Sequence, residues 1–205
     1  MGDAAKELKI RLSNVNIKVD NTSRYASGGR DFYFDEWYNC YYRVSAAQVK
    51  GTGNTKIELD GQNVLDSYSV RYQAGLRKQG EGTLIITDET DDRGNKITTP
   101  KSNDSGSLTA KGAGGNGAAG IGGSVAEGTK NITIEGYATV HAAGGDWGAG
   151  IGGGGYYGEE KPGDAENIII QGYATVDAKG GGVAQALAAA MQEMQKTSSS
   201  GGIPR

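Results

Sequence analysis

The chain contains a repeat that constrains its fold more than any other feature. Residues 131–145 (NITIEGYATVHAAGG) match residues 167–181 (NIIIQGYATVDAKGG) at 11 of 15 positions, with an offset of 36. A divergent third copy comprises residues 84–87 and 106–112. A second pattern, Ala-Gly followed by Ile or Leu, lies at residues 74–76, 119–121 and 149–151. Self-similarity of this kind predicts a repeat architecture in which each copy packs against the next.

Each copy holds three short apolar pieces with the alternation of β-strands. In the best copy, Ile132 and Ile134 flank Thr133, Ala138 and Val140 flank Thr139, and Ile151 follows a glycine-rich corner. We expect strands of three or four residues, which are too short to be stable in isolation. Each must therefore pair in parallel with its counterpart in the next copy. The predicted fold is all-β, a right-handed parallel β-helix (β-solenoid) of about four or five coils over residues 1–182.

Glycine has an architectural role in this prediction. The chain has 36 glycines in 205 residues, whereas average usage is about 7%. Coil corners need positive φ angles and leave little room for a Cβ atom, and glycine meets both demands. Residues 115–120 and 148–153 also fit the dinucleotide pattern G-x-G-x-x-G, but they run into more glycine and strand instead of a helix. We interpret both stretches as corners.

Segments outside the best copies complete the predicted domain. Alternation at residues 8–12, 15–19 and 56–60 predicts earlier, degenerate coils. Two stretches are predicted insertions, an aromatic lateral one at 24–49 and a polar one at 88–105. Apolar residues then recur at helical spacing, which predicts a helix over 183–196 that caps the last coil. Residues 197–205 have the composition of a flexible tail.

Composition excludes several classes of function. The formal net charge is only -3, with no basic stripe, so nucleic acid is not an expected partner. No run of about 18 apolar residues predicts a membrane span, and no signal peptide is expected in this chain. Cys40 and His141 are the only residues of their types, too few for an internal disulfide or a zinc site of their own. No cofactor is expected, with one calcium candidate.

That candidate is the acidic stretch at residues 88–95. It gathers four carboxylates and one amide, hard oxygen donors that calcium prefers, at Asp88, Glu89, Asp91, Asp92 and Asn95. The spacing differs from that of an EF-hand. The alternative interpretation is a solvated loop between coils.

Aromatic residues supply the candidate binding site. Seven aromatics fall within residues 32–42 and are interleaved with Asp, Glu, Asn and Arg. Exposed rings beside such groups suit the C–H faces and hydroxyl rims of sugars, and they also suit a protein interface; packing at the end of the solenoid is a third interpretation. The candidate glycan- or partner-binding residues are Tyr33, Trp37, Tyr38, Tyr41, Tyr42, Trp147, Tyr156 and Tyr157.

Catalysis is the rival hypothesis. The offset aligns Glu135 with Gln171 and His141 with Asp177. If the copies are in register, His141 and Asp177 are neighbours across about 4.8 Å. They form the best acid–base pair in the sequence for a polysaccharide-cleaving enzyme. A glycosidase, however, needs two carboxyl groups that flank one bond, and this pair has one. No catalytic residue is therefore assigned.

The repeats resemble a known group of domains. The segments LDGQNVL, AGL, GTLIITD, GSLTAKGAGGNGAAGIGG and NITIEGYATVHAAGGDWGAGIGGG carry the resemblance, which covers residues 56–182. They are similar to glycine-rich right-handed β-helix repeats of large surface proteins of Gram-positive gut bacteria, sometimes described as carbohydrate-binding-like, and of some phage tail proteins. The resemblance implies an extracellular, cell-surface or virion-borne location, with no signal or cell-wall anchor expected here.

The predicted function follows from these observations. We expect a non-catalytic structural or adhesion module that contacts glycan, or a cell-surface or virion protein, through its loops and outward faces. The alternatives are a β-helical polysaccharide-degrading enzyme and a virion or assembly scaffold that forms homo-oligomers. The identity of the glycan or partner is left open.

Overall fold

The computed structural model describes residues 7–19, 33–35, 40–42, 45–70, 72–91, 93–98, 106–114, 117–155 and 161–181. Of residues 33–35 and 40–42 only the backbone is described. The part of the chain described in this way is all-β and contains no helix. The predicted capping helix at 183–196 and the tail at 197–205 lie outside it.

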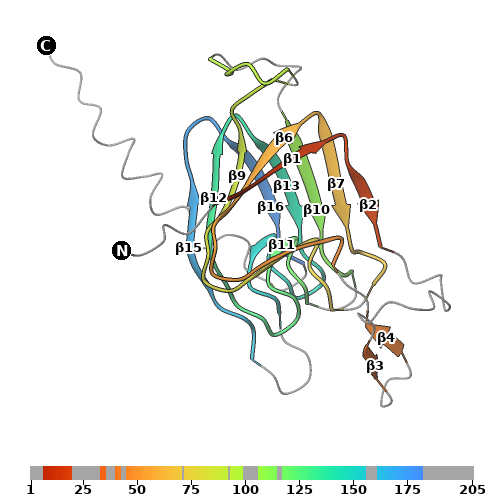
Figure 1. The fold of residues 1–205 in the computed structure, drawn as a ribbon. Helices are drawn as coiled ribbons and strands as arrows, with labels where there is room; N and C mark the ends of the chain where they lie inside the picture. Colours follow the sequence, from red (N-terminus) through yellow and green to blue (C-terminus); the bar gives the residue numbers. More distant parts are fainter. Residues whose placement is uncertain are drawn as a thin grey trace, which may run out of the picture.

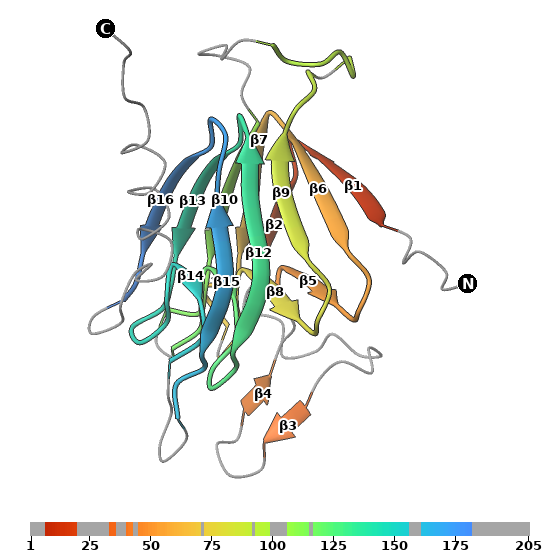
Figure 2. The same ribbon diagram turned by 90° about the vertical axis from the view of Figure 1, so that its left-hand side faces the viewer.

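Three parallel sheets make up the fold (Figures 1 and 2). The first sheet has the order β1 (Leu8–Ser13), β6 (Thr55–Asp60), β9 (Leu84–Asp88), β12 (Thr129–Gly136) and β15 (Ala165–Ile170). The second has the order β16 (Thr175–Lys179), β13 (Thr139–Ala143), β10 (Ser107–Lys111), β7 (Gln62–Asp66) and β2 (Asn16–Lys18). The third has the order β14 (Ile151–Gly152), β11 (Ile121–Gly122), β8 (Leu76–Gln79) and β5 (Ala47–Lys50).

The chain passes through the three sheets in turn, and each pass adds one strand beside the strand of the previous pass. The repeats stack in the predicted register, because Ile134 pairs with Ile170 and His141 pairs with Asp177. The Ala-Gly-Ile/Leu pattern stacks as well, with Ile121 between Leu76 and Ile151. The predicted parallel, in-register pairing of successive copies is thus confirmed.

The expected strand length of three or four residues holds, within the three sheets, only for β2, β5 and β8. The strands of the first sheet have five to eight residues, and those of the third sheet at the Ala-Gly-Ile positions have only two. Backbone hydrogen bonds do not require apolar side chains, so the ladder of β12 extends from Ile132 back through polar residues to Thr129. In the third sheet, the ladders that β11 forms with β8 and β14 span two residues and end at Gly122, whose φ is +131°.

Inward columns of aliphatic side chains fill the narrow space between the sheets. One column of the first sheet holds Ile57, Ile86 and Ile134, which are at most 3% exposed. The third sheet adds Leu76, Ile121 and Ile151, which are also buried. The hydrophobic core therefore follows the stacking direction.

Both predicted insertions leave the stack at its corners. The aromatic one contains β3 (Tyr33–Asp35) and β4 (Cys40–Tyr42), an antiparallel pair set apart from the three sheets in Figure 2. Its end, Ala47–Lys50, pairs with β8 as a strand of the third sheet. The polar one leaves at Asp88 and rejoins the stack at Gly106, with a bridge between Thr90 and Lys96.

Candidate binding face on the second sheet

The structure describes only part of the predicted aromatic cluster. Tyr33, Tyr41 and Tyr42 lie in β3 and β4, where Tyr33 pairs with Tyr42, but their side chains are outside the description. Trp37, Tyr38, Tyr156 and Tyr157 lie outside the described residues. Trp147 is described; it lies in the turn after β13 and is 42% exposed. The binding role of this set stays a prediction.

The second sheet presents a polar outward face. Val140, Leu65 and Ala110 point inward and are buried, so the alternate residues of the same strands point outward. The register arranges these outward residues in rows across the strands. One row holds Ser107, Thr139 and Thr175, the next holds Val64, Thr109, His141 and Asp177, and the third holds Lys18, Asp66, Lys111, Ala143 and Lys179.

Charges on this face compensate one another. His141 Nδ1 lies 3.8 Å from Asp177 Oδ2, as the repeat predicted, and Lys179 Nζ lies 3.1 Å from the same oxygen. Lys111 Nζ lies 3.9 Å from Asp66 Oδ2. The hydrogen bond and charge of Lys179, with a smaller contribution from His141, lower the pKa of Asp177. The carboxyl group is therefore ionised at neutral pH and acts as an acceptor.

Two stacked tyrosines border the face where the first sheet leads into the second. The rings of Tyr137 and Tyr173 lie 5.1 Å apart with an interplanar angle of 4°, and Tyr173 is 69% exposed. Beside them Gln171 Nε2 donates a hydrogen bond of 2.6 Å to Glu135 Oε2. Neither tyrosine is among the binding residues predicted from the sequence. The sequence does carry a signal for the pair, because the Gly-Tyr dipeptide recurs at the same place in both copies.

Further exposed aromatics lie at the opposite ends of the second-sheet strands. Trp147 follows β13, and Tyr68, which is 63% exposed, follows β7. The ring of Tyr68 lies over Gly114, where a Cβ would come within 2.5 Å of the ring carbon Cε2. A five-residue strand spans roughly 16 Å, so this face carries aromatic side chains at both ends of a hydroxyl-rich and charge-compensated surface.

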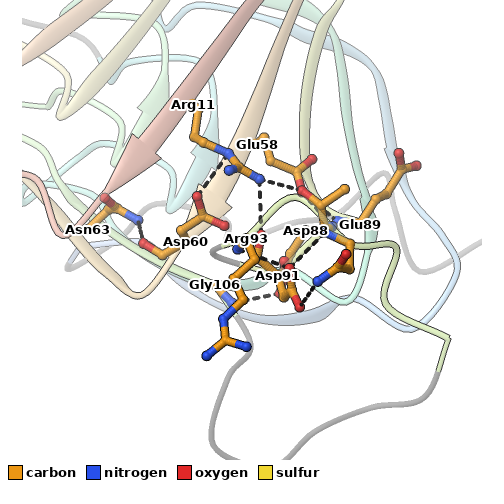
Figure 3. Close-up of polar contacts among 11 residues, drawn as sticks. Arg11, Glu58, Asp60, Asn63, Asp88, Glu89, Asp91, Arg93 and Gly106 are labelled. Carbon is orange, nitrogen blue, oxygen red and sulfur yellow. Dashed lines mark hydrogen bonds and ion pairs between the residues drawn. The ribbon is translucent and has the colours of Figure 1, made fainter.

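A separate polar cluster fastens the polar insertion to the first sheet (Figure 3). Glu58 Oε1 accepts hydrogen bonds from the backbone N–H groups of Glu89 and Thr90 and from the Thr90 hydroxyl. Arg11 donates from Nη2 to Thr90 Oγ1 at 2.6 Å, and its Nε lies 3.0 Å from Asp60 Oδ2. Side chains of two strands, β1 and β6, thus hold the first residues of the insertion.

Asp88 joins the two ends of the same insertion, Asp88 and Gly106, which we call its neck. Its Oδ2 accepts a 2.6 Å hydrogen bond from the backbone N–H of Gly106, while Oδ1 has no hydrogen-bond partner among the described residues. The residue is 1% exposed. Burial raises the pKa of Asp88 to about 6, and the nearby carboxylates of Glu58 and Asp60 act in the same direction. The hydrogen bond from Gly106 and the charge of Arg11 oppose this shift.

In the acidic stretch proposed for calcium, Asp91 and Asn95 are joined by a backbone hydrogen bond that closes a turn. Asp91 accepts hydrogen bonds from the backbone N–H groups of Arg93 and Asn95 and from Asn95 Nδ2. Within the described ranges no group of three or more His, Cys, Asp or Glu residues could hold a metal ion. Asp92 lies outside those ranges, and calcium binding stays a prediction.

A groove of about 420 Å³ lies beside the fastened insertion, over the outer side of the first sheet. Its charged groups are engaged with one another, since Lys56 Nζ lies 2.9 Å from Glu89 Oε2 and Arg11 is bound as described above. The groove therefore belongs to the anchoring of the insertion.

Comparison with known proteins adds no identity. No family model, no curated protein and no solved structure matches the chain. Among the described residues no helix has the length and apolar character needed to span a membrane.

Proposed function

We propose that the chain is a right-handed parallel β-helix that acts as a non-catalytic adhesion or display module and binds glycan on the outward face of its second sheet. The stacked, exposed pair of Tyr137 and Tyr173 beside the rows of Thr139 and His141 carries this proposal. Right-handedness rests on the strong preference of parallel crossover connections for that hand.

The chemistry of the face suits a neutral glycan. Aromatic rings offer apolar surfaces to the C–H faces of sugars, while hydroxyl and charged groups bond to the sugar hydroxyls. Because Asp177 and Asp66 already compensate the lysines beside them, the face offers donors and acceptors with little net field. A polyhydroxylated ligand without charge matches that arrangement.

The face is also rigid, which favours binding. Strands β7, β10 and β13 each have hydrogen-bonded neighbours on both sides. Side chains on such strands lose little conformational freedom when a ligand binds, so the entropic cost of binding is smaller.

Two features of the titratable groups support binding without turnover. Lys179 and His141 lower the pKa of Asp177, so it does not serve as a proton donor at neutral pH. The carboxyl group whose pKa is raised belongs to Asp88, which is 1% exposed and engaged with Gly106. Among the described residues, no carboxyl group with a raised pKa accompanies the accessible pair of His141 and Asp177.

The resemblance of residues 56–182 to surface and tail repeats supports a place for the module on a bacterial surface or on a phage virion. In that setting a stack of sheets holds its outward faces and loops at fixed positions toward a glycan. A protein partner on the same face is the alternative that the binding test separates.

The test is retention of the full chain on immobilised neutral and acidic polysaccharides, with a reducing-sugar assay in parallel. We expect retention on a neutral polysaccharide without product release. Tyr173→Ala should weaken retention about tenfold, since it removes one stacking surface. Thr139→Trp should block the face, whereas Thr133→Trp, on the outward face of the first sheet, should not.

Unchanged retention in both Tyr173→Ala and Thr139→Trp would place glycan binding elsewhere. Release of reducing sugar by the parent chain would favour the enzyme. No retention on any polysaccharide, with capture of a surface protein that Thr139→Trp abolishes, would favour the protein partner.

A further inference from the structure

The two ends of the stack leave the core columns partly exposed. In the column that contains Ile57, Ile86 and Ile134, those three central residues are buried, whereas the end residues Ile10 and Ile170 are only partly buried. Exposure is larger still at Leu8, with 57%, and at Ile17, with 40%. Apolar side chains of the core thus reach solvent at both ends.

The backbone is open at the same places. We call β1 and β2 the first rung, and β15 and β16 the last rung. Among the described strands, each of these four has a neighbour on one side only. An edge strand of this kind presents a row of N–H and C=O groups that can pair with a further strand.

The register shows that the two rungs are complementary. In the first sheet, residues that pair from strand to strand form columns. One column begins at Leu8 and ends at Ile168, and another begins at Ile10 and ends at Ile170. In the second sheet the columns carry Ile17 to the position of Ala178. A first rung laid on a last rung in this register would place an apolar residue on an apolar residue in these three columns.

The same register also sets which polar residues of the two rungs would become neighbours. Arg11 would come to lie beside Gln171, and Asn16 beside Asp177. Lys18 would fall beside Lys179, whose charge Asp177 already compensates at 3.1 Å. Of the charged residues in β1 and β2, Lys18 alone would therefore meet a residue of like charge.

We propose that the partner of these rungs is a second copy of the chain, stacked head to tail. The first rung of one copy pairs in parallel with the last rung of the next, and the columns continue through the contact. The contact is heterologous, so copies add in a row instead of closing into a dimer.

A second copy explains both ends with one contact. The predicted helix at 183–196 follows the last rung in sequence, so it would account for a cover at that end only. The exposed Leu8 and Ile17 belong to the other end. Among the described residues no further strand covers either rung, and another rung is a cover that a repeat stack can supply.

The test is sedimentation of the full chain over a range of concentrations up to about 1 mM. We expect the mean mass to rise with concentration through successive multiples of the chain. Leu8→Lys blocks the first rung, and Ile170→Lys blocks the last; each should be monomeric. An equimolar mixture of the two should form a 1:1 complex that grows no further, because each variant keeps one open rung.

Circular dichroism confirms that the variants fold, and Ala178→Lys replaces Ile170→Lys if the latter does not. Three results would overturn the proposal: a parent chain that stays monomeric at all concentrations, variants that associate as the parent does, or a mixture that forms no complex. A monomeric parent would favour residues 183–196 as the cover of the last rung.

Discussion

At the scale of single residues, Asp88 is the most unusual group in the described structure. It ends β9, it holds the returning chain at Gly106, and one of its carboxylate oxygens has no hydrogen-bond partner among the described residues. Burial favours the protonated form, which removes the charge and can donate a proton of its own. The neck of the polar insertion is therefore sensitive to pH.

The stability of the fold should therefore depend on the protonation of Asp88. Because the pKa of Asp88 is raised to about 6, the folded chain holds this proton more tightly than the unfolded chain. The free energy of unfolding should fall as the pH rises from about 4 to about 6, by at most ~3 kcal/mol, and then stay lower. Asp88→Asn should remove that slope and should be more stable than the parent at pH 8.

Urea unfolding between pH 4 and pH 8 measures the slope, with Glu81→Gln, an exposed carboxyl residue, as the control that keeps the parental dependence. If Asp88→Asn and the parent follow parallel curves, the carboxyl group of Asp88 does not control the pH dependence.

At the scale of elements, the turn that contains the Ala-Gly-Ile pattern sets how closely the second and third sheets approach. A Cβ at Gly120 would lie 2.7 Å from both the Ala143 nitrogen and the Gly150 oxygen. These are backbone atoms of two neighbouring strands and turns, which cannot move aside without breaking their ladders. Glycine is required at this position by space alone, as its φ is not positive.

Gly120→Ala should therefore destabilise the fold by more than about 3 kcal/mol. The matched control is Gly94→Ala in the polar insertion, where no atom lies within 4 Å of a Cβ but φ is +82°. That change should cost only about 1–2 kcal/mol, the strain of a left-handed backbone. Chemical unfolding of both variants checks the order, and an equal loss in the two would refute the close-approach explanation.

The elements also show which parts of the structure the sequence predicted. The register of β12 on β15 and of β13 on β16 was accessible because 36 residues separate near-identical segments. The strand β5 was not, because Ala47 and Val49 alternate over too few residues to stand out from the aromatic insertion. Stacking of Tyr137 on Tyr173 follows from the same register, but only once the corner is known to face outward.

The role of Asp88 was hidden for a different reason. Its partner Gly106 lies 18 residues further along the chain, across an insertion whose path the sequence does not indicate. The acidic composition of that stretch suggested calcium ligands, whereas Asp91 accepts hydrogen bonds from the backbone N–H groups of Arg93 and Asn95 and from Asn95 Nδ2. Local composition identified the polar character of the loop but not the groups that would satisfy it.

At the scale of the whole molecule, every proposal depends on the register in which the repeats stack. It brings His141 to Asp177, places Tyr137 against Tyr173, and leaves matching columns at the first and last rungs. The most direct measurement is disulfide formation by His141→Cys with Asp177→Cys in a Cys40→Ser background.

Neighbouring Cα atoms in register lie about 4.8 Å apart, within the range that a disulfide spans, whereas the diagonal pair Thr139→Cys with Asp177→Cys lies beyond about 7 Å. We predict complete oxidation of the first pair with native circular dichroism, and free thiols in the second. Free thiols in the first pair, or oxidation of the diagonal pair instead, would contradict the account.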